Sequence, residues 1–249
     1  SGVRISWANV SIPAMQLERI LQKHGFGTRK ACRSIIRHER VAVNGAVCID
    51  PFAEIETQGL VFTVDGIDWP YAEFAWLMLH KPAGYECSRK PLHHPGVLTL
   101  LPVQLRERDA QPIGRLDEDT TGLLLITDDG QLNHALSSAK RKMPKVYLAT
   151  TRHPVDQAQV DCLLAGVLLN DEPEPIAAAA CGIVGENVLR LTLTGGKYHQ
   201  VKRMVAAAGN RVDALHREAI GDLLRPDDLK PGEWRWLSAV DLQKLGYSG

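Results

Sequence analysis

The sequence contains no long apolar run, and this absence excludes a large class of proteins. Its 249 residues include no stretch of about 18 or more consecutive apolar residues, so we expect no transmembrane helix. Residues 1–13 also lack a basic start followed by an apolar core, so we do not expect a signal peptide. These features predict a cytoplasmic protein that does not act at a membrane.

Cysteine is scarce, and sequences typical of metal or nucleotide sites are lacking. The five cysteines are scattered and include no Cys-x-x-Cys pair, which favours reduced thiols over a disulfide framework or a zinc site. His93 and His94 are adjacent but have no acid or thiol at ligand spacing, which favours a loop. The chain also has no Walker loop and no Gly-x-Gly-x-x-Gly sequence. We therefore expect no metal and no cofactor.

The whole chain has equal numbers of basic and acidic residues, but one segment is strongly basic. The 29 basic and 29 acidic residues give no net charge, which argues against a uniformly basic nucleic-acid binder. Between residues 19 and 40, however, seven basic residues accompany a single acid, Glu39, and leave a local excess of six positive charges. These basic residues are Arg19, Lys23, Arg29, Lys30, Arg33, Arg37 and Arg40.

Two short amphipathic helices are expected in this basic segment. Apolar residues recur at helical spacing on both sides of Gly25–Gly27, and Thr28 is a suitable N-cap for the second helix. On that helix Arg29, Arg33 and Arg37 fall on one face, where like charges repel one another. This arrangement favours an anionic ligand, although a solvated basic face is the alternative interpretation.

A β-hairpin is predicted directly after the helices. The β-prone runs of Val41–Val47 flank Asn44-Gly45, which is a strong hairpin signal, and Val61–Gly66 is a further β-prone segment. Together with the basic helix, this pattern resembles the S4 RNA-binding domain. The expected organisation is a tail over residues 1–14, an S4-like RNA-binding domain over 15–66, a linker over 67–74 and a second domain over 75–249.

The second domain is expected to mix strands and helices. Trp76–Leu79 and Leu123–Ile126 are apolar runs typical of buried strands, and the absence of regular βαβ alternation favours an α+β fold. Ser238 and Asp241 have the spacing of a capping box for a final helix. Further strands are expected over residues 146–150, 188–194 and 234–237, and helices up to residue 137, over 155–164 and over 199–208.

The most informative segment is Gly114–Gly122, which reads Gly-Arg-Leu-Asp-Glu-Asp-Thr-Thr-Gly and leads into an apolar strand. If this segment is extended, Arg115 and Asp117 point to one side and Leu116 to the other. A loop of this composition at a strand edge is typical of a functional site. The alternative is a turn in which acidic side chains cap backbone amides.

This segment resembles the aspartate motif of the pseudouridine synthases, and most closely that of the small-subunit branch of the family. The resemblance extends from about Leu17 to Leu237. It includes Lys81-Pro82-Ala83-Gly84, Asp128-Asp129-Gly130-Gln131, Lys145-Val146-Tyr147 and the run from Gly195 to Met204. It implies a larger domain with a mixed, mostly antiparallel sheet and an isomerisation of uridine that needs no cofactor.

The resemblance also implies the site residues. Asp117 matches the catalytic aspartate, which acts either as a nucleophile at the sugar or as a base on its C2′ proton; the sequence leaves both routes open. Lys202 stands where the wider family has arginine and would hold Asp117 ionised, unless it is merely a solvated helix residue. Tyr147 matches the tyrosine that stacks on the uracil, although a strand tyrosine is otherwise usually part of the core. Arg115 matches the arginine that fills the gap left by the flipped nucleotide.

We expect the remaining basic and polar residues of these motifs to contact RNA. The expected contacts are Arg29, Lys30, Arg33, Arg37, Lys81, His199, Gln200 and Arg203. The predicted partner is 16S ribosomal RNA within an assembling small-subunit particle, modified at the position called uridine 516, by a protein that acts as a monomer. The alternatives are a synthase that modifies 23S ribosomal RNA and a non-catalytic RNA-binding assembly factor.

Overall fold

The computed structural model describes residues 12–197 and 199–248, which form two compact units. The first unit contains the described residues up to Phe74 together with Pro102–Asp109, and the second contains Ala75–Leu101 and the chain from Ala110 onward. Residues 1–11 of the expected tail lie outside the described residues.

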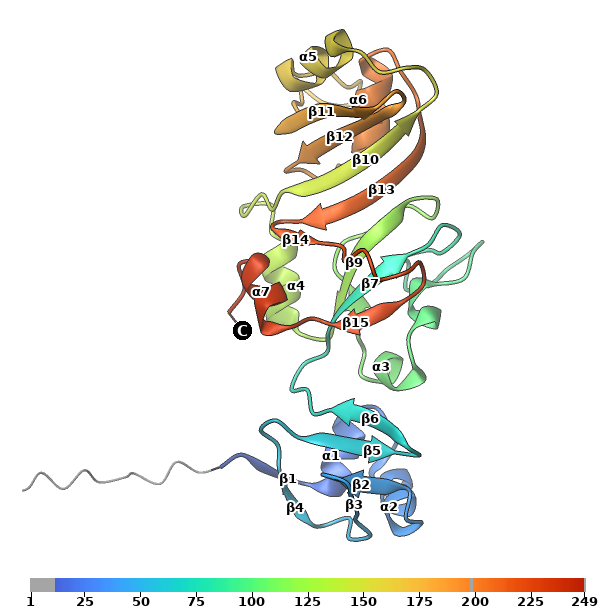
Figure 1. Cartoon of the computed structure of the whole chain (residues 1–249), viewed down its shortest axis with the longest axis vertical. Helices are drawn as coiled ribbons and strands as arrows, with labels where there is room; N and C mark the ends of the chain where they lie inside the picture. The colour runs from blue at the N-terminus through green and yellow to red at the C-terminus, as the bar shows by residue number, and fades with distance from the viewer. Residues whose placement is uncertain (1–11, 198, 249) are drawn as a thin grey trace, which may run out of the picture. The chain divides into compact units, whose positions relative to one another are not determined.

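The first unit combines short helices with small antiparallel sheets (Figure 1). Strands β2, β3, β5 and β6 form a sheet in the order β3-β2-β5-β6, and β1 pairs with β4. Its elements are β1 (Ala14–Gln16), α1 (Leu17–Lys23), α2 (Arg29–Arg37), β2 (Val41–Val43), β3 (Ala46–Val47), β4 (Glu54–Glu56), β5 (Val61–Val64), β6 (Ile67–Pro70) and α3 (Val103–Glu107).

Local sequence explains how these elements begin and end. The Thr28 side chain accepts a hydrogen bond from the Ala31 amide and so caps α2, as expected. Asn44 and Gly45 both have positive φ, of 49° and 83°, and this conformation allows the two-residue turn between β2 and β3. The predicted helices and hairpin are therefore present. The assignment of this unit to the S4 family remains a prediction.

Three expected boundaries are corrected by the structure. Ile67–Pro70, expected in a linker, pairs with β5 as strand β6. Ala14, expected in the tail, belongs to β1, which pairs with β4. Pro102–Asp109 groups with the first unit although the chain around it belongs to the second. These differences arise from pairing and packing between distant segments, which a local pattern does not encode.

The second unit contains a mixed, mostly antiparallel sheet of nine strands flanked by helices, which confirms the predicted α+β class (Figure 1). The main strand order is β11-β12-β10-β13-β9-β7-β15, while β14 pairs with β13 and β8 with β9. The strands are β7 (Trp76–Lys81), β8 (Gln111–Pro112), β9 (Thr121–Thr127), β10 (Lys145–Thr151), β11 (Ala180–Gly185), β12 (Val188–Leu193), β13 (Val212–Ile220), β14 (Leu223–Leu224) and β15 (Trp234–Trp236). The helices are η1 (Val97–Leu100), α4 (Gly130–Ser137), α5 (Gln157–Ala165), α6 (Gln200–Ala207) and α7 (Ala239–Lys244).

The sheet joins two halves, each with its own hydrophobic core. Residues of β10, β12 and β13 pack with α5 and α6 in one core, and residues of β7 and β9 pack with α4 and α7 in the other. The halves meet where β13 and β9 pair in parallel over only two residue pairs, His216 with Thr121 and Arg217 with Gly122. A Cβ atom at Gly122 would lie 2.2 Å from the Arg217 carbonyl oxygen, so this junction requires glycine.

His24 is a buried neutral histidine in the first unit. Its side chain is 1% exposed, its Nδ1 atom lies 2.6 Å from the Ile20 carbonyl oxygen, and its Nε2 atom accepts the Ala72 amide hydrogen at 2.9 Å. Both ring nitrogens are therefore satisfied by one neutral tautomer, with hydrogen on Nδ1. Burial lowers the pKa of His24 to about 4, because the charged ring would lose its hydration.

We predict that the first unit loses stability as the pH falls from about 6.5 to about 4. Over this range the unfolded chain binds a proton at His24 and the folded chain does not, so acidification favours unfolding, by up to roughly 3 kcal/mol. Urea unfolding at several pH values, followed by Trp69 fluorescence in a variant whose other tryptophans are replaced by phenylalanine, would measure the effect. In the matched variant His24→Gln this contribution to the pH dependence should disappear. An unchanged slope in that variant would show that His24 is not the responsible group.

Candidate active site

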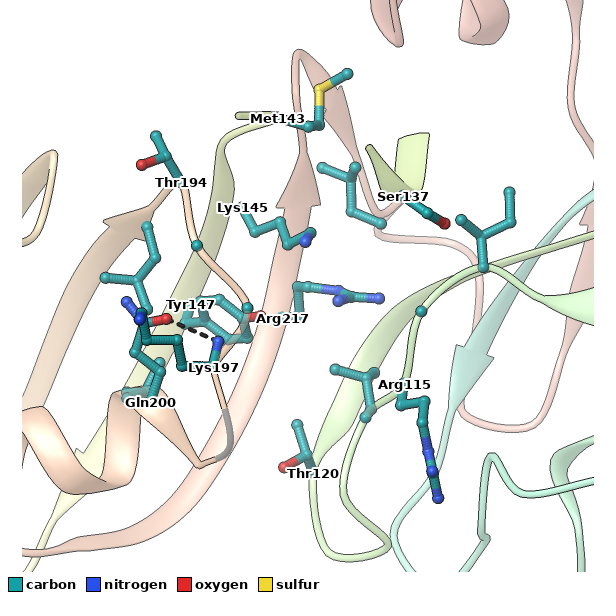
Figure 2. A pocket seen from close by; sticks show the side chains of 18 of the residues that line it. Arg115, Thr120, Ser137, Met143, Lys145, Tyr147, Thr194, Lys197, Gln200 and Arg217 are labelled. Atoms are coloured by element: carbon teal, nitrogen blue, oxygen red, sulfur yellow. Dashed lines mark hydrogen bonds between the residues drawn. The ribbon is translucent and has the colours of Figure 1, made fainter. Parts of the chain in front are cut away.

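The second unit contains a pocket of about 530 Å³ beside the junction of the two sheet halves (Figure 2). It is lined by the segment before β9, by β10 and β13, by Gly195–Lys197 and by the start of α6. Six of the described lining residues are Lys or Arg. Asp117 is the only acid among the described lining residues. The pocket therefore favours an anionic ligand.

Asp117 reaches this pocket because the chain before β9 is extended. Leu116 is buried and its amide donates to the Cys87 sulfur at 3.4 Å, while Arg115 is exposed and Asp117 partly exposed. The predicted alternation of the three side chains is thus present. The Thr120 amide donates to the Asp117 carbonyl oxygen at 3.0 Å and closes the turn that follows.

Lys81 is buried against this turn, which argues against its expected contact with RNA. Its side chain is fully buried, and the Nζ atom donates to the carbonyl oxygens of Pro82, Glu118 and Thr120 at 3.0, 2.9 and 2.7 Å. Burial lowers its pKa, while the nearby acids partly oppose that change. Lys81 is therefore a positioning residue that fixes the backbone next to Asp117.

Lys202 and His199 face the Asp117 carboxylate. The Lys202 Nζ atom lies 3.4 Å from Asp117 Oδ2, and the His199 Nε2 atom lies 3.1 Å from the same oxygen. Lys202 thus meets Asp117 as expected, from the first turn of α6. His199 occupies a left-handed conformation with φ of 46°, which places it at the N-cap of α6. Its contact with the carboxylate places it in the candidate active site.

Asp119 is a member of this cluster that sequence reasoning missed. Lys202 Nζ lies 3.0 Å from Asp119 Oδ1, closer than it lies to Asp117. Although burial lowers the pKa of Lys202, the hydrogen bond and charge of Asp119, helped by Asp117, raise it overall. Lysine thus remains charged between two carboxylates. The Asp-x-Asp spacing in the motif was the available signal, because it places two acids on one short turn.

Tyr147 and Arg115 also line the pocket, from opposite sides (Figure 2). Tyr147 lies on β10, opposite Leu191 on one neighbouring strand and Arg217 on the other. Its side chain is partly exposed, so the ring is available to a ligand. Arg115 is exposed at the start of the aspartate segment. The structure therefore brings together the four residues predicted to be catalytic.

The remaining predicted contacts on α6 have partners within the protein. Gln200 is 7% exposed, and its Oε1 atom accepts the Lys197 amide at 3.0 Å, so it shapes the loop before the helix. Arg203 forms an ion pair with Asp171. Any contact of Gln200 or Arg203 with RNA stays a prediction, and it would have to coexist with or replace these interactions.

The basic helix α2 belongs to the first unit, and its arginines are not equivalent. Arg33 pairs with Glu18, which is 3% exposed, and lies over the Phe52 ring. Arg29 and Arg37 are exposed and, like Lys30, form no salt bridge with a carboxylate among the described residues. The predicted stripe therefore contains two open arginines and one that stabilises its own unit.

Metal and membrane features are not apparent in the described residues. No cluster of three or more His, Cys, Asp or Glu side chains within residues 12–197 and 199–248 has an arrangement that could hold a metal ion. Over the same residues, no helix combines the length and apolar character needed to cross a membrane.

Comparison with known proteins identifies the family. Residues 75–207 match the RNA pseudouridylate synthase family, and the chain belongs to that family. Within it, the chain is 35% identical to ribosomal small subunit pseudouridine synthase A of Haemophilus influenzae, over 93% of this chain and 99% of that protein. It is 38% identical to the protein of the same name from Yersinia pestis, over 93% and 98% of the two chains.

A solved structure supports the same relationship. A crystal structure of a pseudouridylate synthase is 34% identical and superposes with a TM-score of 0.66, covering 93% of this chain and 99% of the other. The likeness therefore extends beyond the residues matched by the family and includes both units.

We predict that Lys81→Met destabilises the second unit and leaves RNA affinity nearly unchanged. The substitution leaves three carbonyl oxygens without their donor, at a cost of roughly 1–3 kcal/mol. Urea unfolding and RNA titration would measure the two effects. Lys90→Met, at an exposed loop position, is the matched control. Weaker RNA binding at full stability would instead restore Lys81 as an RNA contact.

Proposed function

We propose that this protein isomerises one uridine of 16S ribosomal RNA to pseudouridine, at the position called uridine 516. The observation that supports this most strongly is Asp117, held between Lys202 and His199 in a cationic pocket, in a chain that aligns along 93% of its length with small-subunit synthases. A non-catalytic assembly factor would have no need to retain this cluster.

The chemistry begins at the bond between ribose and uracil. The Asp117 carboxylate attacks the sugar or removes its C2′ proton, and the glycosidic bond breaks. Lys202 Nζ and His199 Nε2 lie 3.4 and 3.1 Å from Asp117 Oδ2, so both side chains can hold the carboxylate in position beside the ribose. The uracil then turns and rejoins the ribose through carbon C5, which releases Asp117 from the sugar or returns the C2′ proton. C5 loses its proton and N1 gains one. No electrons enter or leave overall.

Tyr147 would hold the flipped base, and Arg115 would fill the gap that the base leaves in its strand. A tyrosine ring holds a flat base through stacking without fixing one hydrogen-bond pattern, so the base can rotate. Arg115 is exposed beside Asp117, where it can occupy the gap that a flipped nucleotide leaves in its strand. Flipping costs a few kcal/mol, which an inserted cation near phosphates would offset.

The first unit would dock the RNA. Exposed Arg29, Lys30 and Arg37 on α2 contact phosphates, which position the protein without reading sequence. We further propose that the protein acts as a monomer on an assembling small-subunit particle in the cytoplasm.

We predict that Asp117→Asn abolishes turnover, with a loss on the order of 1,000-fold or more, while the fold and RNA affinity persist. Asparagine keeps the shape of the side chain but is neither a nucleophile nor a base. Pseudouridine formation on 16S ribosomal RNA fragments and on immature small-subunit particles would measure the effect. Asp119→Asn, two residues away, is the matched control and should retain more activity. Near-normal turnover in Asp117→Asn would overturn the assignment.

We also predict that Arg29→Gln and Arg37→Gln weaken RNA binding and flatten its salt dependence. Each lost phosphate contact should lower the slope of the logarithmic salt plot by about 0.7–0.9. Arg33→Gln is the informative contrast, since it leaves buried Glu18 unpaired and should mainly reduce stability. Titrations at several salt concentrations would decide. Unchanged slopes for Arg29 and Arg37 would indicate a solvated surface with no part in binding.

A further inference from the structure

Lys145 and Arg217 form a pair of cations on the pocket wall that the proposed mechanism has not yet used. Lys145 and Tyr147 are two residues apart on β10, so their side chains share one face of the sheet. Arg217 is the cross-strand neighbour of Tyr147 on β13. Figure 2 shows Lys145 and Arg217 reaching from these neighbouring strands toward the interior of the pocket that all three residues line.

No acid within the described residues compensates this pair. Arg217 is 3% exposed, its Nε atom donates to the Leu123 carbonyl oxygen at 2.9 Å, and its Nη2 atom is buried without a hydrogen-bond partner. Lys145 is partly buried, and neither residue forms a salt bridge with a described carboxylate. Burial and the charge of Arg217 lower the pKa of Lys145. Two like charges so placed repel each other, and this repulsion opposes the folded arrangement of the pocket wall.

The position of the pair favours the base over a phosphate as its partner. A phosphate remains attached to the strand on both sides and keeps part of its hydration, which suits exposed cations such as Arg115. Arg217 instead lies almost completely buried next to the residue proposed to stack on the uracil. A planar base is small enough to reach this wall.

The proposed reaction creates a negative charge on that base. When the bond between N1 and C1′ breaks, both electrons stay with N1, and the charge spreads to oxygens O2 and O4 of the uracil. When C5 later bonds to C1′ and loses its proton, N1 gains a proton, so atoms and electrons balance. The detached intermediate is therefore an anion that exists only between the two bond changes.

We propose that Lys145 and Arg217 hold the uracil anion during its detachment from the ribose and its rotation. This inference rests on the proposed function, because it concerns the base in the same pocket. Donors that are already in place where charge develops lower the barrier without any rearrangement of the protein. The repulsion between the two cations is then offset when the anion forms.

The test compares two substrates with different leaving groups. Lys145→Met should lower the single-turnover rate of glycosidic cleavage by on the order of 100-fold on RNA that contains uridine at the target position. On the same RNA with 5-fluorouridine the loss should be only a few-fold, because fluorine itself stabilises the base anion. Lys145→Arg should restore most of the uridine rate, since it keeps the charge. Lys244→Met, at an exposed position on α7, is the matched control and should behave as the parent.

The stability of the variant provides a second readout. Methionine removes an uncompensated charge and keeps the length of the side chain, so the melting temperature of Lys145→Met should be equal to or above that of the parent. Arg217→Lys should show the same dependence on the leaving group if it folds. If it does not fold, the Lys145 variants alone still test the inference.

The other outcomes would overturn the inference. Equal losses on both substrates would mean that Lys145 only shapes the pocket. Weaker RNA binding with a smaller salt slope and normal cleavage would make it a phosphate contact. If the parent protein itself converts neither substrate, the proposed function fails, and this result is distinguishable from failure of the inference alone.

Discussion

The close contact between Gly122 and Arg217 is the constraint on which the active site depends. Only two residue pairs join β9 to β13, yet this junction unites two sheet halves with separate hydrophobic cores. A side chain at Gly122 would collide with the Arg217 carbonyl oxygen and force the strands apart. Because Asp117 precedes β9 and Tyr147 lies next to β13, their separation across the pocket is set by this single backbone approach. The last glycine of the aspartate motif is thus a structural requirement.

Electrostatics then determines what the pocket can do. Asp117 carries the proposed chemistry, but it shares Lys202 with Asp119, so the cation is divided between two acids. On the other wall, Lys145 and Arg217 have no described acidic partner. The charge of the site is therefore asymmetric, with paired charge where the ribose would react and positive charge without a salt bridge where the base would lie. This asymmetry suits a reaction whose intermediate is negative on one side only.

Local sequence predicted those features whose causes are local. Asn44-Gly45 produces its turn through backbone conformation, Ser238 and Asp241 form the expected capping box, and Leu116 alternates with Arg115 as expected for extended chain. Features that depend on distant partners were missed. The pairing of β6 with β5, the salt bridge from Arg33 to Glu18 and the burial of Lys81 all require knowledge of what lies across space. The roles of Asp117 and Tyr147 came from resemblance, because spacing alone does not distinguish a catalytic carboxylate from a cap.

The acidic turn beside the pocket has a consequence for how nucleic acid would be held there. Asp171 and Glu172 pair with Arg203 and Lys197, two cations at the edge of the site. A phosphate that binds either cation must replace the carboxylate that already pairs with it. Each such exchange contributes little net affinity and releases few counterions, so these positions would add geometric selection without tight retention. An enzyme that must leave its RNA after a single change benefits from contacts of this kind.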